Sequence, residues 1–138
     1  KIIALEKSFS CEFEGIQIKG VIDRIDSYED KYEVIDYKTS ATLSVDTLKN
    51  YDITDDFQLE FYYLAMSDMY KTDKIEAYYY DLNNTQLINE IALDKKLELL
   101  CEKFNELKEI SKNEISFSKC EDKTNCTYCA YSIICNTE

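Results

Sequence analysis

The stretch GVIDRIDSYEDKYEVIDYKTS, residues Gly20–Ser40, contains two strand-like runs that each carry charge among apolar residues. Both runs place a carboxylate directly after an isoleucine, at Asp23 and at Asp36, and Lys38 follows two residues after the second carboxylate. A charged group among core residues is costly unless it is paired with an opposite charge or binds a metal. We therefore expect this stretch to form part of a site, and not only a solvent-exposed surface.

Three consecutive strands are predicted around this stretch. In residues 3–13, IALEKSFSCEF, apolar and polar residues alternate, which is the pattern of a half-buried strand. Glu14 and Gly15 make a turn into a second strand at 16–27, and SYEDK turns the chain into a third strand at 32–38. Tight turns between consecutive strands favour an antiparallel meander. The apolar face of the first strand is expected to comprise Ile3, Leu5, Phe9, Cys11 and Phe13.

The rest of the chain predicts a helix, two strands and a second helix, at residues 57–70, 74–82, 85–93 and from Asp94 onward. The first helix is apolar on most sides, so we expect it to be largely buried against the sheet. Asp55 or Asp56 can cap its start. Strands, helix, strands and helix in this order predict a mixed α/β (α+β) fold with helices packed on a central sheet.

Composition narrows the chemistry that the chain can perform. The 138 residues carry a formal net charge of −12, from 28 acidic and 16 basic residues, and no histidine. The absence of histidine excludes Ser-His and Cys-His nucleophilic systems and any imidazole zinc site, so the chemistry must use carboxylates, Lys, Tyr or Cys. The acidic charge, taken alone, argues against a nucleic-acid partner. Carboxylates that hold a divalent metal would also account for it.

The length fits one domain, residues 1–138, whose C-terminal tail at 112–138 is rich in cysteine. The chain starts at Lys1 within a strand-like pattern, so we expect it to be a fragment of a larger protein. We find no signal peptide and no apolar run long enough to cross a bilayer, which predicts a cytoplasmic location and no membrane partner.

Asp36 and Lys38 lie on the same face of the predicted strand, because side chains in a strand alternate with a period of two. Asp23 can reach the same region if the two strands pair. Two carboxylates and a lysine are what metal-assisted phosphodiester hydrolysis requires. The carboxylates supply hard oxygen ligands for Mg²⁺, the metal activates water, and the lysine stabilises developing charge. The alternative is an ordinary salt bridge between Lys38 and either carboxylate on a solvated sheet face.

Three segments in order, GVIDRID, EVIDYKTS and QLEFYYLA, resemble the RecB-like branch of the PD-(D/E)xK nuclease superfamily. That branch has a Gly-x-x-Asp motif, an Asp-x-Lys motif and a helix with Gln-x-x-x-Tyr, and the matching residues here are Gly20, Asp23, Asp36, Lys38, Gln58 and Tyr62. The resemblance implies a restriction-endonuclease-like core in which Mg²⁺ or Mn²⁺ is held by Asp23, Asp36 and the backbone carbonyl of Tyr37. It also implies that Lys38 assists the attack by water and that the two helix residues shape the catalytic site.

The six cysteines divide into two groups. Cys11 and Cys101 fall on apolar faces, where a reduced thiol is a small hydrophobe, so we give little weight to three disulfides in a secreted protein. The other cysteines are Cys120, Cys126, Cys129 and Cys135. Two cysteines separated by two residues, with a third after a short turn, have metal-ligand spacing, and this spacing allows either zinc or an iron–sulfur cluster.

The segment NCTYCAYSIIC is similar to the C-terminal triplet of AddB-type nuclease domains. This resemblance implies a 4Fe-4S iron-sulfur cluster held by one cysteine far upstream and by the triplet Cys126, Cys129 and Cys135. No cysteine precedes Cys11, so we expect the fourth ligand to lie upstream of this chain, with Cys120 as the alternative. The family also has an acidic or histidine residue on a helix before the first strand. No such helix is predicted here, and we expect Glu6 to be an exposed strand residue, so we expect this fragment to have an incomplete metal site and to be inactive by itself.

The resemblance implies the nuclease domain of a bacterial helicase–nuclease subunit, which works with a partner subunit on single-stranded DNA ends during double-strand break resection and recombinational repair. One alternative is the CRISPR-adaptation exonuclease of the same superfamily, which has a similar cysteine triplet. A second is a catalytically inert module that binds DNA or a partner. A third is an acidic domain with a zinc-stabilised tail and no catalysis.

Overall fold

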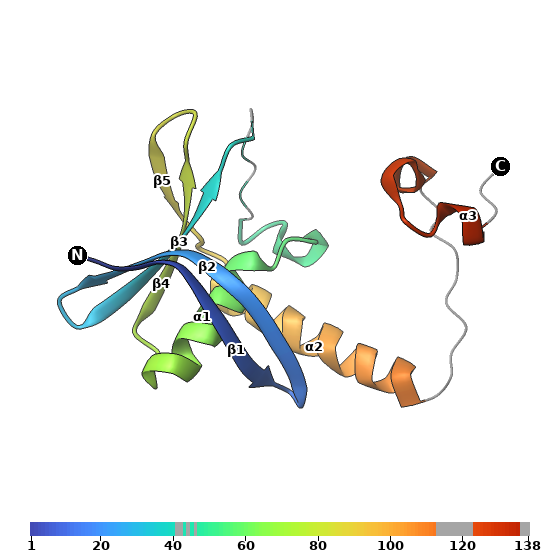
Figure 1. The fold of residues 1–138 in the computed structure, drawn as a ribbon, viewed down its shortest axis with the longest axis horizontal. Helices are drawn as coiled ribbons and strands as arrows, with labels where there is room; N and C mark the ends of the chain where they lie inside the picture. Colours follow the sequence, from blue (N-terminus) through green and yellow to red (C-terminus); the bar gives the residue numbers. More distant parts are fainter. Residues whose placement is uncertain (41–42, 44, 46, 113–122, 136–138) are drawn as a thin grey trace. The chain divides into compact units, whose positions relative to one another are not determined.

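The computed structural model describes residues 1–138 except 41–42, 44, 46, 113–122 and 136–138. Within the described residues, the central feature is a five-stranded sheet with the strand order β1-β2-β3-β4-β5 (Figure 1). Neighbouring strands are antiparallel except β3 and β4, which run parallel. The mixed sheet with its flanking helices confirms the predicted α+β fold. The main elements are β1 (Ile2–Phe13), β2 (Ile16–Tyr28), β3 (Lys31–Lys38), α1 (Gln58–Tyr70), β4 (Ile75–Asp81), β5 (Gln86–Asn89) and α2 (Leu93–Lys112).

The first three strands form the predicted antiparallel meander. At the turn between β1 and β2, Glu14 and Gly15 have φ angles of 52° and 77°. Glycine adopts this left-handed region without steric cost, so Gly15 suits the tight turn. Because β2 and β3 pair, Asp23 and Asp36 lie on adjacent strands.

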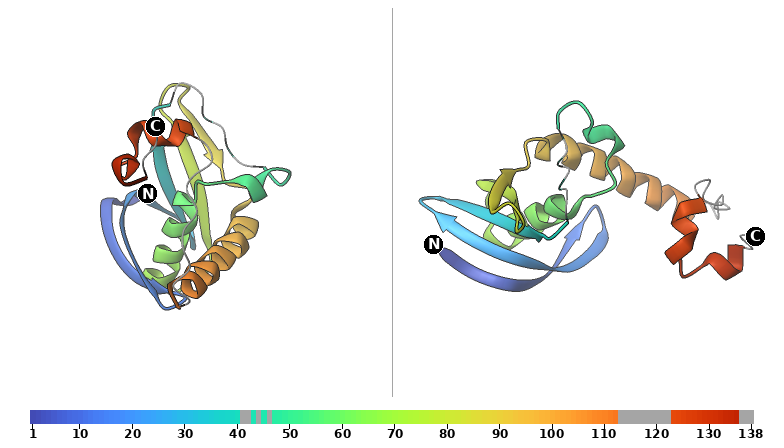
Figure 2. Two further views of the ribbon diagram at one scale, coloured as in Figure 1. Left: turned by 90° about the vertical axis from the view of Figure 1, so that its right-hand side faces the viewer. Right: turned by 90° about the horizontal axis from the view of Figure 1, so that it is seen from above.

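The connection from β3 to β4 crosses from one end of the sheet to the other, because these two strands are parallel. It contains the short helix η1 (Tyr51–Ile53) and then α1. Helix α1 lies on one face of the sheet (Figures 1 and 2), where it contacts β1, β3 and β4. The crossover thus places one helix against β3, the strand that carries Asp36 and Lys38.

Helix α1 begins one residue later than predicted, and the Asp56 side chain forms a hydrogen bond with its first residue. Its Oδ1 accepts a hydrogen bond from the backbone N–H of Gln58 at 3.0 Å, which satisfies one of the donors that a helix start leaves without a partner. Glu60 is also buried on this helix, which its apolar pattern does not predict.

The core cluster comprises Phe9, Cys11, Ile22, Ile25, Val34, Leu59, Tyr62, Ala65, Met66, Ile75, Ala77 and Tyr79.

The predicted apolar stripe of β1 is wrong in the first half of the strand. Phe9 and Cys11 are buried, but Ile3 and Leu5 are 39% and 60% exposed. Glu6 has a φ of 48°, far from the extended conformation, and the register of β1 on β2 also shifts near the start of the strand. Irregularities of this kind re-aim side chains, so the alternation seen at the end of β1 does not extend to its beginning.

The chain divides into two compact units, Lys1–Glu106 and Leu107–Glu138. The sheet and α1 belong to the first unit. The predicted tail at 112–138 falls in the second, whose described elements include η2 (Lys123–Tyr128) and α3 (Ser132–Cys135). Among the residues that the structure describes, no helix is both long and apolar enough to cross a membrane.

Candidate active site

The sheet and α1 bring the five side chains predicted from the motifs into one cluster. These residues are Asp23 on β2, Asp36 and Lys38 on β3, and Gln58 and Tyr62 on α1. The first link runs between the strands, where Asp23 Oδ2 accepts a hydrogen bond from the backbone N–H of Tyr37 at 3.0 Å. This bond holds the β2 carboxylate beside the β3 residues.

Gln58 connects the lysine to the buried carboxylate. Lys38 Nζ donates to Gln58 Oε1 at 2.8 Å, and Gln58 Nε2 donates to Asp36 Oδ1 at 2.5 Å. Lys38 Nζ also lies 2.9 Å from Asp36 Oδ2 in an ion pair. The four-residue step between Gln58 and Tyr62 places Tyr62 one turn further along the helix, where its hydroxyl is 3.0 Å from Gln58 Nε2.

The Tyr62 hydroxyl marks the point where the two carboxylates converge. It lies 3.5 Å from Asp23 Oδ1 and 3.5 Å from Asp36 Oδ1. Burial raises the pKa of Tyr62 to about 12, and the charges of the two carboxylates act in the same direction, while the hydrogen bond with Gln58 opposes them. The phenol therefore stays protonated at neutral pH and can donate a hydrogen bond.

Asp36 is almost completely removed from solvent, with 2% of its surface exposed. This burial raises the pKa of its carboxyl group, while the hydrogen bond and the charge of Lys38 oppose the shift. The ion pair with Lys38 is the one that the alternative interpretation predicts. It does not lie on a solvated face, however, because Asp36 is buried, and a buried carboxyl group with a raised pKa is a candidate functional residue.

The donor set suits a hard divalent cation. Asp36 Oδ2 is buried and, apart from its ion pair with Lys38, has no hydrogen-bond partner among the described residues. Asp23 supplies a second carboxylate close by. Carboxylate and backbone carbonyl oxygens are the ligands that Mg²⁺ prefers in proteins. No group of three or more His, Cys, Asp or Glu side chains placed to hold a metal occurs in the described residues. The fitting set is therefore two carboxylates, and the carbonyl of Tyr37 as a third ligand stays a prediction.

Two cavities adjoin this cluster. The larger, of about 590 Å³, is lined by Leu5, Glu6, Asp23 and Tyr37. Glu6 stands across from Asp23, because its neighbours Leu5 and Lys7 pair with Arg24 and Ile22 on β2. Glu6 is exposed, as predicted, but sequence reasoning missed its position at the site. Its left-handed backbone cannot be read from the sequence.

Sequence reasoning also missed two residues around Lys38. Asp56 Oδ2 lies 3.6 Å from Lys38 Nζ, and the ammonium lies 5.1 Å from the centroid of the Tyr79 ring. Asp56 could have been found from its position two residues before Gln58, at the start of the helix. Tyr79 could not, because the run of three tyrosines on β4 looks like ordinary strand packing.

The comparison with protein families identifies the family of this chain. The family model described as PD-(D/E)XK nuclease superfamily matches residues 1–136. The chain belongs to the PD-(D/E)XK nuclease superfamily. The search of curated proteins finds no match. Among solved structures, the crystal structure of SSO0001 is similar at 20% sequence identity with a TM-score of 0.45, over 95% of this chain and 58% of that one.

The cysteine triplet of this PD-(D/E)XK domain lies in the second unit. Cys129 N–H donates to the carbonyl of Cys126 at 3.3 Å, and Cys135 N–H donates to the carbonyl of Tyr131 at 3.1 Å. Their thiols do not form a group placed to hold a metal in the described part of the chain. Cys120, the alternative fourth ligand, lies outside the described residues. In the first unit, Cys11 is buried as predicted, and Cys101 is half-buried.

Proposed function

We propose that this chain is the catalytic domain of a metal-dependent nuclease that hydrolyses phosphodiester bonds of DNA. One observation carries the proposal: the carboxylates of Asp23 and Asp36 converge on the Tyr62 hydroxyl, 3.5 Å from each. Lys38 is held beside the second carboxylate at 2.9 Å. Membership of a nuclease superfamily supports the same chemistry.

Each residue has a role that follows from its contacts. Asp23 and Asp36 would hold Mg²⁺ or Mn²⁺, together with the backbone carbonyl of Tyr37. When bound, the metal would polarise the phosphate and lower the pKa of a water molecule. Lys38 would orient the attacking water and stabilise negative charge that develops on the phosphate.

The α1 residues keep this arrangement fixed. The side-chain oxygen of Gln58 accepts a hydrogen bond from Lys38, and its nitrogen donates one to the Asp36 carboxylate. Gln58 would therefore fix the position of the lysine relative to this carboxylate. Tyr62 supplies a protonated hydroxyl between the two carboxylates. Groups that are already ordered need little rearrangement during the reaction, and this is the main source of electrostatic catalysis.

We further propose that the domain acts in an AddB-like subunit of a helicase–nuclease that resects double-strand breaks by cutting single-stranded DNA ends. The segments DYKTS and QLEFYYLA support this placement over the CRISPR-adaptation exonuclease, which has a similar cysteine triplet. A net charge of −12 fits a domain whose basic DNA path is supplied by other domains and a partner subunit.

The 4Fe-4S cluster is part of this finer proposal and rests on the spacing of Cys126, Cys129 and Cys135 with a fourth ligand upstream. Its test is iron and sulfide content, with the visible absorption of the cluster, after reconstitution of a chain extended upstream. Stoichiometric zinc in place of iron would support the zinc-stabilised tail instead.

The nuclease activity itself is tested with end-labelled single-stranded DNA and Mg²⁺ or Mn²⁺. Lys38→Ala should abolish metal-dependent cutting. Lys71→Ala is a matched control, because Lys71 lies at the far end of α1 in an exposed ion pair with Asp68. Cutting that survives in Lys38→Ala would contradict the assigned role. Absence of cutting by every variant, in the presence of DNA binding, would support the inert module.

A further inference from the structure

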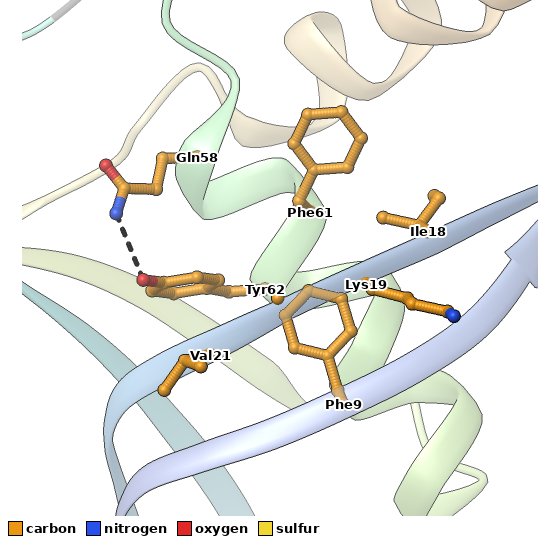
Figure 3. A pocket seen from close by; sticks show the side chains of 8 residues that line it. Phe9, Ile18, Lys19, Val21, Gln58, Phe61 and Tyr62 are labelled. Atoms are coloured by element: carbon orange, nitrogen blue, oxygen red, sulfur yellow. Dashed lines mark hydrogen bonds between the residues drawn. The ribbon is translucent and has the colours of Figure 1, made fainter.

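The second cavity is a pocket of about 350 Å³ between α1 and the first two strands. Figure 3 shows the rings of Phe9, Phe61 and Tyr62 gathered around it, with the Gln58 amide beside the Tyr62 hydroxyl on one side and Lys19 on the other. The full lining is Phe9, Ile18, Lys19, Gly20, Val21, Gln58, Phe61 and Tyr62.

Gly20 explains why the aromatic wall can form. It pairs with Phe9 across the β1–β2 ladder, and a Cβ atom at this position would lie 2.8 Å from two carbons of the Phe9 ring. Only glycine lets the ring lie over β2 at this distance. The glycine of the Gly-x-x-Asp motif thus places an aromatic surface three residues from the Asp23 carboxylate.

The inner part of the wall is fixed by packing, and the outer part remains accessible. Phe9 and Tyr62 contact each other edge to face with ring centroids 6.5 Å apart, and both are buried. Phe61 is half-buried and packs against Phe104, with ring centroids 6.1 Å apart. Val21 is 47% exposed at the edge of the pocket. Phe61 keeps part of its surface exposed, so its ring can stack with a planar ligand beside the two fixed rings.

The pocket is continuous with the catalytic cluster, because Gln58 and Tyr62 belong to both. A DNA strand whose phosphate lies at the carboxylates would therefore bring a neighbouring base to this wall. Its volume is near the lower limit for ligand pockets, so it suits one base and not a base pair. Lys19 adds a cation at the edge of an otherwise acidic chain, where it can meet a backbone phosphate.

We infer that this pocket holds one unpaired base of single-stranded DNA, stacked on the aromatic wall beside the phosphodiester bond that is cut. The inference rests on the proposed nuclease function and adds a selection rule to it. A base in a duplex is stacked and paired, so it cannot enter the pocket until the strands separate. The pocket therefore favours single strands over duplex ends and does not select sequence, since every base has a face that can stack.

A binding experiment tests this without relying on catalysis. The probe is a single-stranded oligonucleotide with 2-aminopurine at one position, mixed with the metal-free protein in chelator. Stacking quenches its fluorescence, so wild type should quench it. Phe61→Leu, which keeps an apolar side chain but loses the ring, should bind roughly tenfold more weakly and quench less. Tyr28→Leu is the control, because Tyr28 is an exposed ring on β2 that does not line the pocket.

A second variant covers the case in which Phe61→Leu disturbs the packing with Phe104. Val21→Glu puts a carboxylate at the exposed edge of the pocket without touching the core, and should weaken binding to a similar degree. An abasic site at the quenched position should weaken wild-type binding and leave Phe61→Leu unchanged. Lys19→Ala should weaken the binding of intact and abasic oligonucleotides alike. It should also reduce the dependence of the binding constant on salt concentration by about one phosphate contact.

The outcomes separate the pocket from the nuclease function. Binding with base-dependent quenching but no cutting would support the pocket and count against the enzyme. Cutting by wild type with equal affinity for intact and abasic strands would overturn the pocket and leave the enzyme in place. Equal affinity for duplex and single strands would also overturn it, as would full quenching by both Phe61→Leu and Val21→Glu.

Discussion

Two groups of charged side chains contact helix α1, and they differ in their access to the surroundings. The open cluster consists of the five site residues, and two cavities adjoin it. The closed cluster consists of Glu60, Glu90 and Lys96. Lys96 Nζ lies 3.2 Å from Glu90 Oε2 and 3.4 Å from Glu60 Oε1, and these three residues are at most 3% exposed.

The comparison shows that buried charge alone does not indicate a catalytic site. Both clusters contain one lysine and two carboxylates, and both shift the pKa of a carboxyl group upward. In the open cluster a neutral amide and a phenol lie among the charges, and the carboxylates border a cavity. In the closed cluster the ions contact one another directly and all three residues are buried. We therefore interpret the closed cluster as a link between α1 and the start of α2.

The largest expected effect on stability comes from removing the cation of the closed cluster. Lys96→Met leaves two carboxylates buried without their lysine, which should lower the free energy of unfolding by about 3–5 kcal/mol. The melting temperature should fall by roughly 10–15 °C. Lys95→Met is the matched control, because the neighbouring Lys95 makes an exposed ion pair with Glu98, and its stability should stay close to that of wild type.

Equal stability of Lys96→Met and Lys95→Met, measured by urea unfolding, would remove the closed cluster as a structural link. Loss of activity without loss of stability in Lys96→Met would assign it to the catalytic machinery instead.

The open cluster should respond in the opposite way. Asp36→Asn removes a proposed metal ligand and should lower the cleavage rate by roughly 10²–10³-fold or more. Stability should change little, because burial already disfavours the charged form of this carboxyl group and the amide keeps its size. The measurement pairs single-turnover cleavage with thermal unfolding. A variant that melts far below wild type would place Asp36 with the structural charges.

The pH dependence of stability should report on the closed cluster, because Glu60 belongs to it. Burial raises the pKa of Glu60 to about 7, and the charge of Glu90 adds to the effect, while Lys96 opposes it. A folded-state pKa above the ordinary value of 4.5 means that the native state binds this proton more tightly than the unfolded chain. Its stabilising effect is complete below pH 4.5 and is lost as the pH rises to about 7.

The free energy of unfolding should therefore fall between about pH 4.5 and pH 7, with a contribution from Glu60 of at most about 3 kcal/mol. Glu60→Gln keeps the shape and does not titrate, so its stability should fall less over the same window. Urea unfolding at several pH values measures the difference in the free energy of unfolding between wild type and Glu60→Gln. The contributions of the other carboxylates are common to both proteins and cancel in this difference. Parallel pH profiles would show that Glu60 does not hold the proton.

Strand spacing predicted Asp23, Asp36 and Lys38 as one site, whereas Gln58 and Tyr62 were added to it only by the resemblance to the nuclease family. Two strands that pair and a helix that crosses them must bring residues at fixed steps together, so the sequence alone places Asp36 with Lys38 and Gln58 with Tyr62. The closed cluster could not be predicted. Lys96 lies far from Glu60 in the sequence, and a charged residue in an amphipathic helix is expected to face solvent.

The first half of β1 could not be predicted for a different reason. Alternation assumes an extended backbone throughout, and Glu6, at a φ of 48°, departs from it. A left-handed conformation at a residue other than glycine has an energetic cost that the surrounding structure must offset. Nothing in the local sequence IALEKSF signals it, since glutamate and its neighbours also fit a regular strand.

The smallest effect is expected at Glu6, and it sharpens the boundary of the open cluster. Glu6 stands across from Asp23 and lines the same cavity, so its charge should attract a divalent cation toward the site. Because Glu6 is exposed, solvent and salt screen this attraction. Glu6→Gln should therefore raise the Mg²⁺ concentration for half-maximal cleavage by only about two- to threefold, with the maximal rate unchanged.

Glu12→Gln is the control for this measurement, because Glu12 is another exposed glutamate on β1 and lies outside that cavity. A shift above about tenfold in Glu6→Gln would mean that Glu6 binds the metal directly, since one screened charge is worth at most about 1 kcal/mol. The open cluster would then contain three carboxylates, and the irregular backbone of β1 would be explained by the need to turn Glu6 toward the metal.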